Sequence, residues 1–170
     1  MNTAPCSPDA LAHPKVLSLP KLLAALAPLR EQGKKIVFTN GCFDIVHPGH
    51  VDLLARAKAE GDVLILGLNS DASVKRLRKG PGRPVNPLPV RAFVLAHLAS
   101  LDFVTYFDED TPFELIKAIA PDVLVKGGDW TPDRIVGRDI VESFGGRVLS
   151  LPLLSGFSTT SLIARIREDV

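Results

Sequence analysis

Short runs of aliphatic and aromatic residues alternate along the chain with longer segments in which apolar residues recur every three or four positions. The short runs are typical of buried strands and lie at 36–39, 63–68, 103–107, 123–125 and 148–151. The segments with helical spacing lie at 48–61, 91–100, 111–119 and 158–168. Strands that alternate with helices are joined by right-handed crossovers into a parallel sheet. The pattern therefore predicts an α/β fold, with a Rossmann-like sheet of five parallel strands and helices on both faces.

Three segments fall outside this alternation. Residues 1–17 mix Pro, Ala and polar residues without periodicity, and we expect them to form a flexible N-terminal tail. Leucines recur at helical spacing over 19–33, although Pro28 should bend or end that helix near its last turn. Residues 71–87 combine Lys and Arg with Gly and Pro, which predicts a long basic loop. At about 100–200 residues per domain, residues 18–170 should form a single domain.

The composition is that of a globular protein. Of the 170 residues, 46% are apolar and 23% charged, which excludes general disorder and permits a core without disulfide or metal staples. A formal charge of +1 gives no reason to expect nucleic acid or an anionic membrane as a partner. Cys6 and Cys42 form no CxxC, so neither a disulfide framework nor a zinc cluster is expected. No signal peptide is predicted, and no apolar run approaches the roughly 18 residues of a membrane helix, so we expect a cytoplasmic protein.

The tetrapeptide His47-Pro48-Gly49-His50 directly follows the first predicted strand and opens the next helix. Pro is favoured at the first helical position, and Gly49 lets a ligand approach the backbone. Ligands bind beyond the carboxyl ends of parallel strands, and a helix N-terminus favours negative charge there. We therefore expect His47 and His50 to bind one phosphate. The alternatives are a pair of surface or capping histidines and a metal site with Asp44 as third ligand.

Other segments that follow strand ends should gather at the same edge of the sheet. In the basic loop, Lys79 and Arg83 are the preferred phosphate ligands, against the alternative of a solvated charged surface. Lys126 is followed by Gly127 and Gly128, which suits a backbone turned toward a ligand or forms a plain turn.

Two more features belong to this edge. Trp130 either stacks on a base or sugar or covers the core. Ser158, Thr159 and Thr160 precede the last helix, where their hydroxyls can cap the helix, bind the last phosphates of a nucleotide, or do both.

The segment from Phe38 to Asp44, followed by His47–His50, resembles the signature of the cytidylyltransferase-like nucleotidyltransferase superfamily. Three later motifs are similar to one branch of it, the D-glycero-β-D-manno-heptose 1-phosphate adenylyltransferases. These motifs are GPGRPVNP at 80–87, VLVKGGDW at 123–130 and GFSTTS at 156–161. The resemblance covers about residues 34–168 and implies a fold of the nucleotidyltransferase type.

The resemblance implies transfer of AMP from ATP to a sugar 1-phosphate, with release of pyrophosphate and formation of an ADP-heptose for the lipopolysaccharide inner core. His47 and His50 would stabilise charge on the α-phosphate while the sugar phosphate attacks in line, so no nucleophilic residue is needed. The floor of the nucleotide site would be formed through backbone N–H groups by Thr39, Asn40, Gly41, Cys42 and Phe43. In this family the domain occurs either behind a sugar kinase or alone, and this length leaves no room for the kinase.

Further residues take their expected roles from the same resemblance. Lys79 acts with the histidines, and Lys75 is added to the basic loop, which closes over the triphosphate. Arg91 should face phosphates, although Val90 stands where an acidic residue is usual. The second substrate is expected to contact Arg83, Asp129 and Trp130. Asp44 is expected among these substrate-binding residues, and from the residues alone it either fixes the loop or orients a histidine.

The preference for ATP over CTP rests on one difference from the cytidylyl relatives. Cytidylyl relatives that act on glycerol 3-phosphate carry Arg-Thr where this chain has Leu153-Leu154, so ATP is preferred to CTP. The alternatives are a cytidylyltransferase for a small phosphorylated alcohol such as glycerol 3-phosphate, and a non-catalytic nucleotide-binding module. Mg²⁺ is expected with ATP, held through phosphates and water without dedicated protein ligands. Because relatives often form homodimers, a homodimer is a possible assembly.

Overall fold

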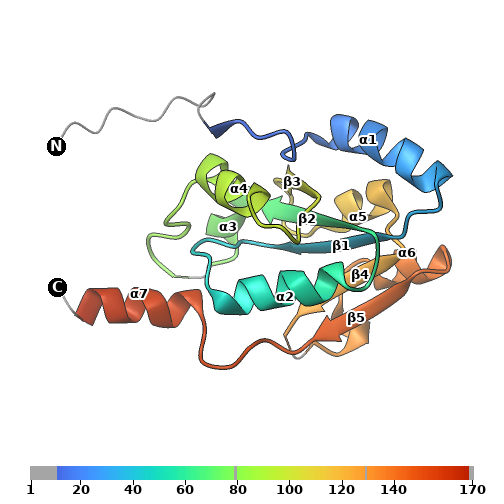
Figure 1. Cartoon of the computed structure of the whole chain (residues 1–170). Helices are drawn as coiled ribbons and strands as arrows, with labels where there is room; N and C mark the ends of the chain where they lie inside the picture. The colour runs from blue at the N-terminus through green and yellow to red at the C-terminus, as the bar shows by residue number, and fades with distance from the viewer. Residues whose placement is uncertain (1–10, 79, 129, 169–170) are drawn as a thin grey trace.

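The computed structural model describes residues 11–78, 80–128 and 130–168, which fold around one parallel sheet (Figure 1). The strands are β1 (Ile36–Gly41), β2 (Val63–Asn69), β3 (Phe103–Phe107), β4 (Val123–Gly127) and β5 (Arg147–Leu151). Their order in the sheet is β3-β2-β1-β4-β5. The chain builds outward from β1 to β3 and then crosses to β4 on the other side of β1. This reversal creates a crevice beyond the carboxyl ends of β1 and β4, the place where such sheets bind ligands.

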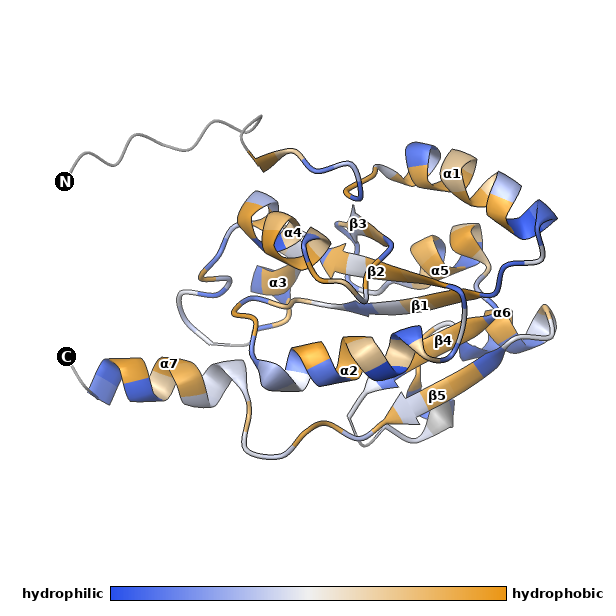
Figure 2. Ribbon diagram, in the orientation of Figure 1, coloured by the Kyte–Doolittle hydropathy of each residue, from blue (hydrophilic) through white to orange (hydrophobic). Residues whose placement is uncertain are grey.

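Helices cover both faces of the sheet, as the alternating pattern predicted. The helices are α1 (Leu19–Glu31), α2 (Pro48–Lys58), α3 (Asp71–Arg76), α4 (Leu88–Ala96), α5 (Phe113–Ile119), α6 (Arg138–Ser143) and α7 (Thr159–Glu168), with a short 3₁₀ turn at Pro132–Arg134. One core lies between the sheet and α2 and α4, and includes Val37 of β1. The second lies against α1, α5 and α6, and includes Phe38. Because neighbouring strand residues point to opposite faces, strands buried on both sides are apolar almost throughout (Figure 2).

The predicted basic loop is partly helical. Residues 71–76 form α3, which Ser70 caps by accepting a hydrogen bond from the Ser73 N–H at 3.0 Å. Asp71 in its first turn and Lys75 and Arg76 in its last complement the helix dipole. The prediction of a loop was therefore wrong for this part, because a helix this short shows no apolar periodicity. The helix expected at 91–100 begins earlier, at Leu88, and α6 was not predicted.

The segment expected to be a tail is attached to the sheet over residues 15–17. The Val104 N–H donates to the Lys15 carbonyl at 2.8 Å, and the Leu17 N–H donates to the Val104 carbonyl at 2.9 Å. The Lys15 ammonium also donates to the carbonyl of Leu101 at 2.6 Å. These contacts extend the sheet beside its edge strand β3 by one parallel bridge.

The last helix, α7, extends away from the rest of the fold on the side where the loop at 80–87 lies (Figure 1). It buries none of its residues. Within the ranges given above, no helix combines the length and the apolar character needed to cross a bilayer.

Candidate active site

The two histidines of the HPGH segment stack on each other at the start of α2. His47 is the N-cap with an extended backbone, and Pro48 is the first helical residue, as predicted. The ring centroids of His47 and His50 lie 3.7 Å apart with planes inclined by 19°, and the Phe43 ring lies 4.7 Å from that of His50. Burial lowers the pKa of His47 below its ordinary value. The fold thus holds two imidazoles side by side beyond the end of β1.

A cavity of about 350 Å³ opens in front of this histidine pair, within the size range of small-molecule sites. It brings together predicted residues from four distant segments of the chain. They are Asn40, Gly41, Cys42, Phe43, Asp44, His47, Gly49, His50, Arg83, Lys126, Gly127, Trp130, Ser158, Thr159 and Thr160. The rule that ligands bind beyond strand ends accounts for this convergence. The individual roles of these side chains stay predictions.

The start of α7 forms one side of this cavity. The Ser158 hydroxyl accepts a hydrogen bond from the Ser161 N–H at 3.0 Å and donates to the Ser161 hydroxyl at 2.9 Å. Ser158 therefore caps the helix, which was one of its two expected roles. Thr159 and Thr160 follow it along the cavity wall.

A second cavity, of about 290 Å³, lies on the other side of a shared wall. Both cavities are lined by Asn40, Gly41, Cys42, Lys126 and Trp130. The Lys126 ammonium in this wall lies 3.4 Å from the Asn40 side-chain oxygen. Trp130, whose role was open, thus borders two cavities.

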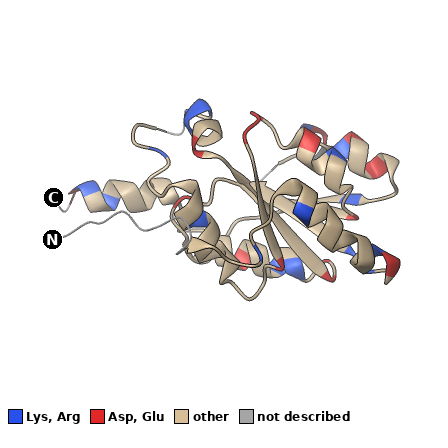
Figure 3. Ribbon diagram, turned by 90° about the horizontal axis from the view of Figure 1, so that it is seen from above, with Lys and Arg blue, Asp and Glu red and all other residues tan. Residues whose placement is uncertain are grey.

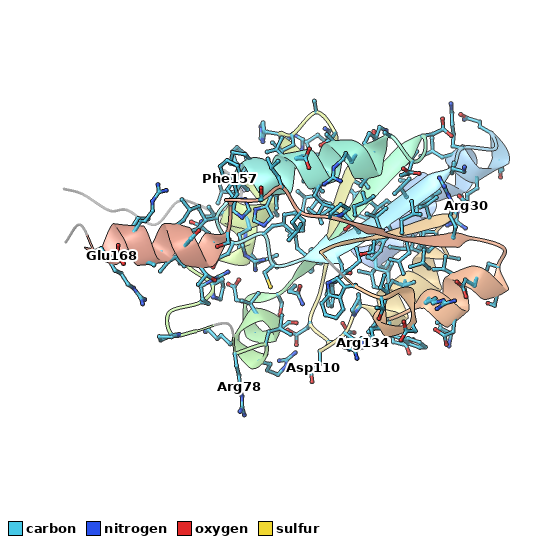
Figure 4. The ribbon with its side chains drawn as sticks, turned by 90° about the horizontal axis from the view of Figure 1, so that it is seen from below. Arg30, Arg78, Asp110, Arg134, Phe157 and Glu168 are labelled. Carbon is cyan, nitrogen blue, oxygen red and sulfur yellow. The ribbon has the colours of Figure 1, made fainter. Side chains whose placement is uncertain are left out.

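The far end of the second cavity is polar and was not predicted. Asn69 ends β2, Asp110 and Thr111 follow β3, and Arg134 follows β4. Figure 4 shows Asp110 and Arg134 on the same side of the molecule. The strand-end rule selects the segment that begins at Asn69, and it would also have selected Asp110, had it been applied to the end of β3, where no motif stands.

Asp44 lines the first cavity and braces the loop at 80–87 through hydrogen bonds. Its carboxylate is fully buried and paired with the Arg83 guanidinium, and it accepts the N–H groups of Val85 at 2.8 Å and Asn86 at 2.9 Å. Burial alone would raise the pKa of Asp44, but these backbone donors and Arg83 outweigh it and hold the pKa below its ordinary value. The carboxylate oxygens are thus occupied within the fold. This favours the bracing role of Asp44 over substrate contact or a metal site with the histidines.

Arg91 does not line the first cavity, so the structure lends no support to its expected contact with phosphates. Its guanidinium is buried and donates to the carbonyls of Cys42 at 2.7 Å and Asn69 at 2.8 Å. It also pairs with Asp71 at 2.8 Å and donates to the Asn86 carbonyl at 3.0 Å. Arg91 therefore ties the ends of β1 and β2 to the loop that Asp44 braces.

Four other predicted residues are not placed in either cavity. Thr39 is buried within β1, and its hydroxyl has no hydrogen-bond partner in the described part of the chain. Lys75 is exposed on α3 and lines neither cavity. Lys79 and Asp129 lie outside the described residues.

A parallel sheet with a stacked histidine pair beside the cavity at its switch point fits a nucleotidyltransferase. The chain belongs to the cytidylyltransferase-like family, whose model matches residues 38–164. Among curated relatives, the bifunctional protein HldE of Syntrophotalea carbinolica is 57% identical over 139 residues, which cover 82% of this chain and 28% of the relative. HldE of Ectopseudomonas mendocina is 55% identical over 153 residues, covering 90% and 32%. The chain thus spans about a third of the length of these relatives.

Solved structures show the same fold at low identity. A lipopolysaccharide core biosynthesis protein from Thermoplasma volcanium has a TM-score of 0.58 at 22% identity, covering 72% of this chain and 98% of that one. The pantoate-beta-alanine ligase of Francisella tularensis has a TM-score of 0.57 at 16% identity, covering 91% and 78%. The five-stranded nucleotidyltransferase-like fold predicted from the sequence is confirmed.

Proposed function

We propose that this chain transfers the adenylyl group of ATP to D-glycero-β-D-manno-heptose 1-phosphate, giving ADP-heptose and pyrophosphate. The observation that carries this proposal is the stacked His47–His50 pair facing a cavity that shares a wall with a second one. Transfer between two bound substrates needs two adjoining subsites, whereas a nucleotide-binding module needs one. The heptose acceptor is supported by the four motifs and by the HldE relatives, which are similar over most of this chain.

ATP would occupy the first cavity. His47 and His50 would donate hydrogen bonds to oxygens of the α-phosphate and stabilise the charge that develops there. Thr159 and Thr160, at the positive end of the α7 dipole, would hold the phosphates that leave. Burial lowers the pKa of His47, and the negative charge of a bound nucleotide would act in the opposite direction and favour the protonated ring.

The sugar phosphate would occupy the second cavity. Lys126 in the shared wall would bind its phosphate next to the α-phosphorus, and Asp110, Thr111 and Arg134 would bind sugar hydroxyls at the far end. A phosphate oxygen then attacks the α-phosphorus, and the bond from that phosphorus to the β-phosphate oxygen breaks. Its electron pair leaves with pyrophosphate, so no covalent enzyme intermediate is required.

The walls of the first cavity fit a magnesium ion carried by the nucleotide. Among the described residues no group of three or more His, Cys, Asp or Glu could hold a metal, and the one cavity carboxylate, Asp44, is occupied by Arg83. The neutral side-chain oxygen donors among the described residues of the wall are the Asn40 amide and the hydroxyls of Ser158, Thr159 and Thr160. Such neutral donors suit an ion that keeps phosphate and water ligands. When bound, Mg²⁺ would neutralise charge on the triphosphate.

The test is pyrophosphate release by the purified chain with Mg²⁺, crossing ATP and CTP with heptose 1-phosphate and glycerol 3-phosphate. We expect turnover only with ATP and heptose 1-phosphate. Turnover with CTP and glycerol 3-phosphate would establish the cytidylyltransferase alternative. Nucleotide binding without turnover in all four mixtures would favour the binding module. Since ATP is the donor, we place the reaction in the cytoplasm, while the homodimer stays a prediction.

Gly49→Ala is expected to lower kcat by up to about tenfold, because a misplacement of about 1 Å costs about 10²-fold and the displacement here is smaller. A Cβ at position 49 would lie 3.2 Å from two ring atoms of His47, so the ring must move. Stability should hardly fall, since Ala favours a helix over Gly by up to about 1 kcal/mol. Steady-state kinetics and a thermal melt check both parts. An unchanged kcat would mean that the His47 ring tolerates displacement.

A further inference from the structure

A third hollow, a groove of about 180 Å³, lies between α7 and the loop at 80–87. The loop contributes Gly80, Pro81 and Arg83 to its lining, and α7 contributes Thr160, Ile163, Ala164 and Arg167. Figures 1 and 4 both show α7 and this loop on the same side of the molecule. Arg83 and Thr160 also line the first cavity. The groove is therefore a continuation of that cavity along α7.

The sequence of α7 matches this groove. Thr160, Ile163, Ala164 and Arg167 are spaced three and four residues apart, so they form one stripe along the helix. Arg165 carries the same charge on the same helix but does not line the groove. Arg167 thus lies two turns beyond Thr160 on the face that borders the loop.

The groove is suited to an anion. Among the described residues, its lining contains two arginines and no acidic residue. Figure 3 shows Lys and Arg on α3, on the loop and on the outer part of α7. Arg83 is buried and uses its Nε to pair with Asp44. The Nη groups of Arg83 have no hydrogen-bond partner within residues 11–78, 80–128 and 130–168. The ion pair with Asp44 fixes the position of these donors where the first cavity and the groove meet.

The groove borders the first cavity but not the second one. The second cavity and the groove share no lining residue, and each shares residues with the first cavity. In an in-line displacement the leaving group departs on the side opposite the attacking oxygen. If the acceptor attacks from the second cavity, the groove is the neighbouring hollow that the acceptor does not occupy, and Arg83 and Thr160 connect it to the first cavity.

We propose that this groove binds the pyrophosphate product, with Arg83 at its inner end and Arg167 at its outer end. The inference rests on the proposed function, since it needs a reaction that releases pyrophosphate. At about 180 Å³ the groove is smaller than the roughly 300 Å³ of small-molecule pockets, which suits a compact anion such as a diphosphate. Arg167 is therefore a pyrophosphate-binding residue that lies outside the motifs of the family.

The test measures the affinity of inorganic pyrophosphate and of AMP by titration calorimetry for the whole chain and three variants. Arg167→Ala should weaken pyrophosphate binding by at least about tenfold, as expected for loss of a charge-assisted hydrogen bond. Arg165→Ala is the matched control and should change it by less than about twofold. Ala164→Glu, which adds a carboxylate to the groove lining, should weaken pyrophosphate binding as well. AMP affinity should stay the same in all three variants.

The possible results distinguish failure of the groove as a pyrophosphate site from failure of the proposed adenylyl transfer. Equal pyrophosphate affinities of Arg167→Ala and Arg165→Ala would overturn the inference, and so would a parent chain that binds ATP but no pyrophosphate. A parent chain that binds neither ATP nor AMP would instead overturn the proposed function. A matching rise in the inhibition constant of pyrophosphate in Arg167→Ala, with the KM for heptose 1-phosphate unchanged, would support both.

Discussion

Replacing His47 or His50 by Ala is expected to lower the rate of adenylyl transfer by about 10²–10³-fold, the effect of losing one donor that stabilises a developing oxyanion. The two rings are stacked at 3.7 Å and face the same cavity, so each is placed to contact the same phosphate. The chain should stay folded, because loss of a ring stacking contact costs about 1 kcal/mol. Initial rates of pyrophosphate release and a thermal melt check the two statements.

His97→Ala is the control for the histidine pair. His97 lies beyond the end of α4, where its ring is 4.4 Å from that of Phe93 and 4.5 Å from that of His13. It lines none of the three hollows, so its loss should leave the rate unchanged. A fall of less than about threefold, roughly 0.6 kcal/mol in barrier height, in His47→Ala and His50→Ala would contradict the assigned role of the pair.

The sheet was predictable because its strands are buried on both faces. Every residue of β2 is buried, so the run Val63–Leu68 is apolar throughout and stands out against the helical segments. The start of α2 was predictable from the local sequence, because Pro48 favours the first position of a helix and Gly49 leaves the backbone accessible, and neither property depends on distant residues. The convergence of Asn40, Lys126 and Thr160 followed from the parallel order of the strands alone.

The parts that the sequence did not reveal depend on contacts between distant residues. Arg91 is a charged residue in a loop-to-helix segment, and only the folded chain shows that it donates to the carbonyls of Cys42 and Asn69. Lys15 is likewise fixed by a carbonyl from the distant residue Leu101. The capped helix α3 is too short for periodicity. The positive charge of Arg91 favoured a phosphate contact at the level of the sequence. In the structure, Arg91 and Lys15 donate to backbone carbonyls.

Asp44→Ala is expected to lower the free energy of unfolding by about 3–5 kcal/mol, the cost of removing one partner of a buried ion pair. The substitution leaves the buried Arg83 charge without its carboxylate and the N–H groups of Val85 and Asn86 without an acceptor. Asp52→Ala is the matched control, because Asp52 pairs with Arg56 at 2.7 Å on the surface of α2. Loss of such an exposed pair costs at most about 1 kcal/mol. Urea denaturation followed by circular dichroism measures both values.

The pH dependence of stability separates the charge of Asp44 from its packing. The folded pKa of Asp44 is held below its ordinary value, so its contribution to stability is complete above the unfolded pKa of about 3.9 and is lost as pH falls through the folded pKa. Asp44→Ala should therefore lose less stability than the parent chain on acidification below about pH 4. The double variant Asp44→Ala/Arg83→Met removes both charges and should recover part of the stability at neutral pH. If Asp44→Ala destabilises the chain no more than Asp52→Ala does, the loop at 80–87 is held by its own packing and Asp44 is not its brace.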